Sequence, residues 1–324
     1  MEWWTRVAVT ESLYNIICGQ VQLLQPLLIT VVVLLCSTFT KFYPMMDLHP
    51  FLEPSTLPSS KMWHVLATSG DRPAVRVGHT CIHILGSGQS NGHLYVTGGA
   101  NPSGTFSDMF CLDLDSFSWQ KFPAVDFSGR YEHTVFRSGG DPTRFFVFGG
   151  ADCIGNRNDV QEFDIAGKTW RTLETTGTAP PPRTFHNGAC VGDTLIVYGG
   201  GKRGAEPVAD KNTYAFDIAE QHWSVLKLHG DAPKPRHGHL MVAVGSRLFL
   251  HGGMSGSVFF DDLHILDLDR SCWSCTKVKS LKPARRAAHG GFVSGANVFV
   301  FGGMNDSGAL SDIFSLNTGR QSVE

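Results

Sequence analysis

Histidine and carboxylate side chains are frequent in this 324-residue chain, and several stand at spacings that suit catalysis or metal binding. A histidine can act as a general base or as a metal ligand. Five of the 14 histidines follow an arginine by three positions, in the pairs Arg76/His79, Arg130/His133, Arg183/His186, Arg236/His239 and Arg286/His289. Because the Arg-x-x-His pattern recurs at regular intervals, we expect a structural role, with each imidazole packed beside the repeated arginine.

Two further groups of residues resemble metal sites. Glu206 and Asp210 match the start of E-x-x-x-D-x-x-x-H, the iron-binding pattern of plant nitrile-specifier proteins, but Tyr214 stands where histidine is required. We expect both carboxylates to be solvated in a loop. Cys272 and Cys275 have C-x-x-C spacing, but on a strand they point to opposite faces, and the sequence has no second such pair. The sequence therefore predicts no metal site.

Two known catalytic signatures are absent from the sequence. It contains no P-loop and no S-x-D-x-G-x-T-W box of sialidases. A net charge of −2 with 17% charged residues does not indicate the basic surface that is typical of nucleic-acid binding. The eight cysteines form no disulfide-like pattern, which favours a reducing compartment. We expect a protein without catalytic residues, metal or cofactor.

Paired glycines reveal the elements that must position these residues. Each pair closes a run of aliphatic and aromatic residues, and the pairs follow one another at intervals of 51, 50, 53 and 50 residues. They are Gly98–Gly99, Gly149–Gly150, Gly199–Gly200, Gly252–Gly253 and Gly302–Gly303. This period predicts an all-β, kelch-type β-propeller of about five blades. Each blade is a four-stranded sheet that becomes stable only by stacking on its neighbours.

Other residues keep step with the glycines. An aspartate or asparagine follows the first glycine by ten residues (thirteen in the third repeat), at Asp108, Asp159, Asn212, Asp262 and Asp312. We assign these residues to turns, where they would bond backbone amides. Eleven residues later stand Trp119, Trp170, Trp223 and Trp273, which we expect to fill the wedge between blades. Strand a then follows Arg-x-x-His, b ends at the glycines, c follows the aspartate and d carries the tryptophan.

The ends of the array determine how the ring closes. A fifth tryptophan is expected at position 323, which is valine. The segment 61–66 contains Trp63 and has the pattern of a d strand without a repeat of its own. We predict that it completes the last sheet and closes a five-blade ring over residues 61–324. The alternative is a six-blade ring that lacks part of one blade.

The N-terminal leader, residues 1–58, differs in composition from the repeats. Residues 12–40 carry no charged side chain, and the segment 21–39 is largely apolar. It could be a membrane anchor or a cleaved signal sequence. Another possibility is an upstream extension, with the native start at Met45 or Met46. The charges that flank the segment do not fix an orientation in a membrane.

Loops on a rigid propeller are the usual place for recognition. Alternation of strands places the b–c and d–a loops on one face of the disc, called the loop face below. Its candidate partner-binding residues are Arg157, Lys202, Arg203, Arg236, His237, Phe259 and Phe260. Arginine and aromatic side chains dominate binding hot spots. The alternative for either phenylalanine is that it packs inward. His251, which precedes a glycine pair, is expected to be a core residue.

Several loops also carry a family resemblance. The segments are GGANPSGTFSD (98–108), RYEH (130–133), GNRN (155–158), PRTFH (182–186), GGGKRGAEPV (199–208), PRHGHLMVA (235–243) and HGGMSGSVFFDDLH (251–264). Over about residues 62–316 the chain resembles the kelch-motif effectors of the late-endosomal Rab GTPase number nine. That family continues into a further repeat, and the apolar leader has no counterpart in it.

The resemblance implies a non-enzymatic scaffold that binds a GTP-loaded Rab and assists vesicle transport from endosomes to the trans-Golgi network. It also implies a cytoplasmic protein associated with endosomal membranes. The alternative location is a membrane to which the N-terminal segment anchors the protein. The alternative function is a generic kelch adaptor that presents other protein partners, for example in ubiquitin ligation or cytoskeletal assembly.

Overall fold

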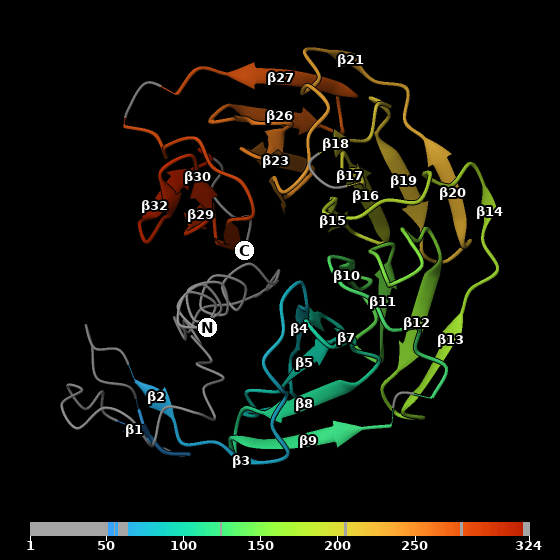
Figure 1. The fold of residues 1–324 in the computed structure, drawn as a ribbon, viewed down its shortest axis with the longest axis vertical. Coiled ribbons are helices and arrows are strands. Elements are labelled where there is room, and N and C mark those ends of the chain that lie inside the picture. Colours follow the sequence, from blue (N-terminus) through green and yellow to red (C-terminus); the bar gives the residue numbers. More distant parts are fainter. Residues whose placement is uncertain are drawn as a thin grey trace.

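Strands form all the regular secondary structure that the computed structural model describes, which covers residues 51–54, 56–57, 64–123, 125–203, 206–278 and 281–319. Figure 1 shows their sheets following one another around an arc. The leader up to residue 50, Trp63 and Val323 lie outside the described residues. No helix within these residues could span a membrane.

Five sheets are the blades. Blade 1 contains β3 (Ser69–Gly70), β4 (Thr80–Ile84), β5 (His93–Thr97), β8 (Met109–Asp113) and β9 (Ser118–Phe122). Blade 2 contains β10 (Thr134–Phe136), β11 (Arg144–Phe148), β12 (Val160–Asp164) and β13 (Thr169–Thr172). Blade 3 contains β14 (Thr176–Gly177), β15 (Asn187–Val191), β16 (Thr194–Tyr198), β19 (Tyr214–Asp217) and β20 (His222–Val225). Blade 4 contains β21 (His229–Gly230), β22 (Leu240–Val244), β23 (Arg247–His251), β26 (Leu263–Asp267) and β27 (Cys272–Thr276). Blade 5 contains β28 (Gly290–Ser294), β29 (Asn297–Phe301) and β32 (Ile313–Asn317).

The main strands of each blade pair antiparallel in chain order, as the repeat predicts. The five-blade, all-β, kelch-type arrangement is thus confirmed. A feature that the repeat does not predict is a fifth, short strand in blades 1, 3 and 4. In each case the link that enters the blade runs parallel to its outermost strand, for example Thr176 beside His222. The link therefore covers an edge that would otherwise be open.

Short hairpins rise from the ends of the inner strands on the loop face. They pair β6 (Ala100–Asn101) with β7 (Gly104–Thr105), β17 (Gly201–Arg203) with β18 (Glu206–Pro207), β24 (Met254–Ser255) with β25 (Val258–Phe259), and β30 (Met304–Asn305) with β31 (Gly308–Ala309). Each hairpin occupies the predicted b–c position. Isolated bridges join the Arg-x-x-His segment to the b–c loop of the same blade, as between His237 and Met254.

The core lies between blades. One cluster joins Tyr95 and Phe122 of blade 1 to Phe145 and Phe163 of blade 2, and comparable clusters join each later pair of neighbours. Trp170, Trp223 and Trp273 are at most 3% exposed and pack in clusters shared with the preceding blade, as predicted. The ring of Trp223, for instance, lies 4.7 Å from that of Phe148 in the preceding blade. Trp119 is equally buried, but it packs among residues of blade 1 and Leu66, so the prediction is wrong for it. Because most of the apolar area is shared between sheets, no blade has a complete core of its own.

The predicted ring closure is wrong for the residues that the structure describes. Residues 65–66 form β2 (Val65–Leu66), which pairs in parallel with β1 (Phe51–Leu52). The last sheet has β32 at its edge. Two residues separate β2 from β3, and β3 is hydrogen-bonded to β9 of blade 1. Because this link is so short, β2 cannot reach across the molecule to blade 5. Leu66 instead packs on the outer face of blade 1. The described blades form an open arc, with blades 1 and 5 apart in Figure 1.

Candidate functional site

A buried arginine stands at the entrance to each blade. Its guanidinium donates to the carbonyl oxygen of the first paired glycine and forms an ion pair with an aspartate at the start of the third main strand. In blade 3, Arg183 Nη1 lies 2.8 Å from the oxygen of Gly199, and Nη2 lies 2.8 Å from Asp210 Oδ2. The other pairs are Arg76–Asp108, Arg130–Asp159, Arg236–Asp262 and Arg286–Asp312. All five arginines are at most 2% exposed.

The role predicted for the aspartates is therefore incomplete. They neutralise buried cations rather than marking turns alone. In the third repeat Asp210 takes this position, so the assignment to Asn212 and the prediction of a solvated Asp210 carboxylate are wrong. Asp210 stands eleven residues after Gly199, against ten elsewhere, and this spacing was the available signal. Tyr214 is buried under the Arg183 guanidinium, 5.0 Å from ring centroid to carbon, so this cluster is structural.

The same motif connects one blade to the next. The second glycine of each of the first four pairs donates its N–H to the carbonyl oxygen of the following blade's arginine, at 2.8 Å between Gly99 and Arg130. The following blade's histidine covers the first glycine. A Cβ added to Gly149, whose φ is +64°, would lie 2.8 Å from His186 Cε1. The Arg-x-x-His and glycine positions thus lock adjacent blades together, and the predicted structural role of the histidines agrees with this geometry.

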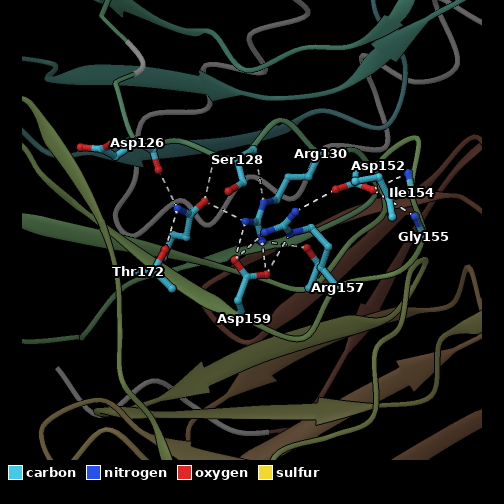
Figure 2. Close-up of polar contacts among 11 residues, drawn as sticks. Asp126, Ser128, Arg130, Asp152, Ile154, Gly155, Arg157, Asp159 and Thr172 are labelled. Carbon is cyan, nitrogen blue, oxygen red and sulfur yellow. Dashed lines mark hydrogen bonds and ion pairs between the residues drawn. The ribbon is translucent and has the colours of Figure 1, made fainter.

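Blade 2 extends this motif into a polar network on the loop face (Figure 2). Asp159 accepts from Arg130 at 2.7 Å and from Arg157 at 3.1 Å, and Arg157 also bonds Asp152 at 2.8 Å. Burial opposes ionisation of Asp159, but the two arginines outweigh it and lower its pKa. Asp152 in turn accepts from the backbone amides of residues 154 and 155. The network fixes the loop that carries Arg157.

The buried histidines predict a specific pH dependence. His251, the residue before a glycine pair, is 7% exposed, and its Nδ1 lies 3.1 Å from His289 Nε2. Burial and the nearby Arg286 cation lower the pKa of His251 to about 4. Because the unfolded chain then binds the proton more readily than the folded protein, stability is complete above pH 6.5 and is lost as the pH falls toward 4.

Replacement of His251 by phenylalanine, which stands at this position in blades 2 and 5, should reduce that loss by about 2 kcal/mol between pH 6.5 and 5. Urea unfolding of both proteins at several pH values in this range measures the difference. The buried histidines other than His289, which is bonded to His251, titrate in both proteins, so their common contribution cancels. An unchanged pH slope in His251→Phe would contradict a neutral, buried imidazole at this position.

The predicted partner-binding residues fall into two groups. Arg236 is fully buried in its ion pair, and its guanidinium lies 4.1 Å from the centroid of the Phe260 ring. The prediction that Arg236 contacts a partner directly is therefore wrong. His237 is 5% exposed, and its ring lies beside that of Phe185. Phe260 packs inward, which was the alternative considered. A buried position removes Arg236 and His237 from the candidate surface.

The remaining candidates lie on neighbouring loops. Lys202 is exposed, Phe259 is half-buried in its hairpin, and the Arg157 side chain is 28% exposed. Arg203 belongs to β17, and only its backbone is described. Asn156 Nδ2 donates to the backbone oxygens of residues 201 and 202, at 3.0 and 2.7 Å, which connects blade 2 to the hairpin of blade 3. That hairpin also contacts the hairpin of blade 4. The loops of blades 2, 3 and 4 thus form one continuous rim.

Within the described residues, no group of three histidine, cysteine or acidic side chains is arranged to hold a metal ion. Cys272 is half-buried and Cys275 is exposed, on one strand.

Comparison with known proteins agrees with this architecture. Residues 56–253 match the KLHDC2/KLHL20/DRC7 Kelch-repeats domain, and residues 235–276 match the Kelch motif. The chain belongs to the kelch-repeat family. It is 45% identical over 216 residues to the Rab9 effector protein with kelch motifs of Mus musculus, across 66% of this chain and 57% of that protein. The Homo sapiens protein of the same name is 44% identical over 216 residues, 66% of this chain and 58% of that protein.

The Danio rerio protein of this name is 38% identical over 236 residues, 69% of this chain and 67% of that protein. This kelch-repeat chain therefore spans somewhat less than two thirds of the mammalian relatives that it matches. The similarity includes the repeats that carry the loop face, since the domain match covers blades 1 to 3 and part of blade 4.

Proposed function

We propose that this kelch-repeat protein is a non-enzymatic scaffold whose loop face binds a GTP-loaded Rab GTPase. The observation that supports this proposal is the continuous rim across blades 2, 3 and 4, where Asn156 ties one loop to the next. A rigid surface with an exposed lysine and a half-buried phenylalanine suits a protein partner. The relatives named as Rab9 effectors indicate which class of partner to test. Association with endosomal membranes, through the bound Rab, is part of the proposal.

The full-length chain is expected to retain Rab9 loaded with a non-hydrolysable GTP analogue in a pull-down, and to retain GDP-loaded Rab9 much less. The reason is that the switch segments of a GTPase become ordered only around the third phosphate. Equal retention of both forms, or retention of neither, would contradict the proposal. Equal retention would favour a generic adaptor.

A charge reversal locates the contact. Lys202→Glu, on the rim, should weaken GTP-loaded Rab9 binding by about three- to tenfold, because a charge at an interface edge alters association. Lys168→Glu is the matched control, since Lys168 is also exposed but lies in the loop between β12 and β13, on the opposite face. Isothermal titration calorimetry measures both. Equal effects of the two changes would place the contact elsewhere.

A further inference from the structure

The residue before each motif histidine occupies a common position at the centre of the loop face. These axial residues are Gly78, Glu132, Phe185, Gly238 and Ala288, and all have left-handed backbones with φ between 50° and 64°. Backbone hydrogen bonds connect several of them from blade to blade, such as Gly238 N to the oxygen of Phe185 at 2.9 Å. The axial position therefore brings residues from all five blades around one centre, and Glu132 is the one axial residue with an ionisable side chain.

Glu132 is crowded but has no cationic neighbour. Its Oε2 accepts a hydrogen bond from Thr184 Oγ1 at 3.0 Å, and none of the ion pairs among the described residues includes it. Burial raises the pKa of Glu132 to about 8, and the Thr184 bond offsets only part of this effect. Glu162, by contrast, is also largely buried but is paired with Arg144 and Arg171. An acid that is held out of water without a partner destabilises the folded state.

The surroundings of Glu132 suit a cation that comes from outside the chain. The side chain is half-buried and lies over Gly78, where an added Cβ would come within 3.0 Å of Glu132 Cγ. Tyr131 precedes Glu132, and burial together with the nearby Glu132 carboxylate raises the pKa of the Tyr131 phenol. A carboxylate without an ion-pair partner among the described residues can form a charge-assisted hydrogen bond with a lysine or arginine side chain.

We propose that Glu132 receives a lysine or arginine side chain that a protein partner places at the centre of the loop face. The charge of that side chain would satisfy the unpaired carboxylate, and the narrow setting would select for a long, flexible cation. For the identity of the partner, this inference rests on the proposed function. For the binding chemistry, it rests on Glu132 and its neighbours alone.

The test compares the wild-type protein with Glu132→Gln and Glu220→Gln. Glutamine at position 132 keeps the acceptor for Thr184 and removes the charge, so the thermal midpoint should stay equal or rise. Glu220, an exposed carboxylate in the loop between β19 and β20 on the opposite face, controls for loss of surface charge. Titrations are made at pH 8.5, where the Glu132 carboxylate is well populated and Tyr131 stays neutral, because burial raises the pKa of Tyr131.

Two probes separate the site from the partner. N-acetyl-arginine methylamide should cause saturable NMR shifts at the Glu132 amide, and the uncharged citrulline derivative should not; Glu132→Gln should abolish the effect. GTP-loaded Rab9 should bind Glu132→Gln at least tenfold more weakly than the wild type, with Glu220→Gln unchanged. Equal Rab9 affinity for all three proteins would overturn the inference and leave the proposed function intact. If Rab9 does not bind even the wild type, the proposed function fails, and the arginine derivative alone decides: shifts lost in Glu132→Gln support the site, and their absence overturns it.

Discussion

Replacement of Arg130 by alanine is expected to lower the free energy of unfolding by about 3–5 kcal/mol. Arg130 is fully buried, and its guanidinium bonds Asp159, Gln161 and the carbonyl oxygen of Gly149. Its removal takes a donor from each of these acceptors and leaves the Asp159 carboxylate with Arg157 as its remaining arginine partner. The effect should extend to the boundary with blade 1, because the oxygen of Arg130 accepts from Gly99. Urea unfolding followed by tryptophan fluorescence provides the measurement.

The control is an exposed ion pair of similar length. Lys282 Nζ lies 2.8 Å from Asp261 Oδ2, and the two side chains are 47% and 43% exposed. Lys282→Ala should therefore change stability by less than about 1 kcal/mol, since water screens the pair and replaces its bonds. Similar losses in both variants would show that the buried guanidinium contributes no more than a surface charge, and would refute the structural role assigned to the motif.

Alanine at Gly252 should destabilise the protein by roughly 2–5 kcal/mol, for two separable reasons. The φ of +65° is unfavourable for a residue with a Cβ, which accounts for about 1–2 kcal/mol. The added Cβ would also lie 2.7 Å from the oxygen of Arg286 and 2.9 Å from His289 Cε1, both in the next blade. Relief of that overlap requires blade 5 to move away from blade 4, which adds about 1–3 kcal/mol.

A second glycine in blade 4 isolates the conformational part. Gly256 has a φ of +58°, but an added Cβ there would meet no atom within 4 Å. Gly256→Ala should therefore lose only about 1–2 kcal/mol. Equal destabilisation at the two positions, measured by thermal and urea unfolding, would mean that the glycine pair is needed for backbone conformation alone and not for the contact between blades.

The sequence was sufficient to predict the repeated architecture because the repeat applies the same packing constraint five times. The glycine pairs lie where their spacing predicts, and three of the four tryptophans that the structure describes, Trp170, Trp223 and Trp273, are buried between blades. The closure of the ring was predicted wrongly because the segment that contains Trp63 matches a d strand by type alone. Its place depends on the two-residue link to β3, whose pairing with β9 leaves no periodic signal.

The candidate site was harder to predict, because composition does not indicate burial. Arg236 and Lys202 are both basic residues next to the predicted loops, yet one is enclosed and the other is exposed. The paired aspartates show why: a buried arginine requires a carboxylate partner, and the recurrence of both an arginine and an aspartate in every repeat was the sign of that pairing. Glu132 could not be distinguished in this way, since its unusual setting arises from residues that three different blades bring together.

The short parallel strands at the outer edges of blades 1, 3 and 4 shift the physical start of each module upstream of its arginine. Thr176–Gly177 and His229–Gly230 belong to the blades that follow them, although the preceding tryptophan strand lies only a few residues earlier. A gene duplication that copied one whole blade would thus have to begin before such a strand and end before the next one. A blade inserted at such a boundary would lengthen the array and leave β20 and β27 paired with their short parallel strands. A boundary at Arg183 or Arg236 would instead separate the short strand from its blade and leave the outermost strand unpaired.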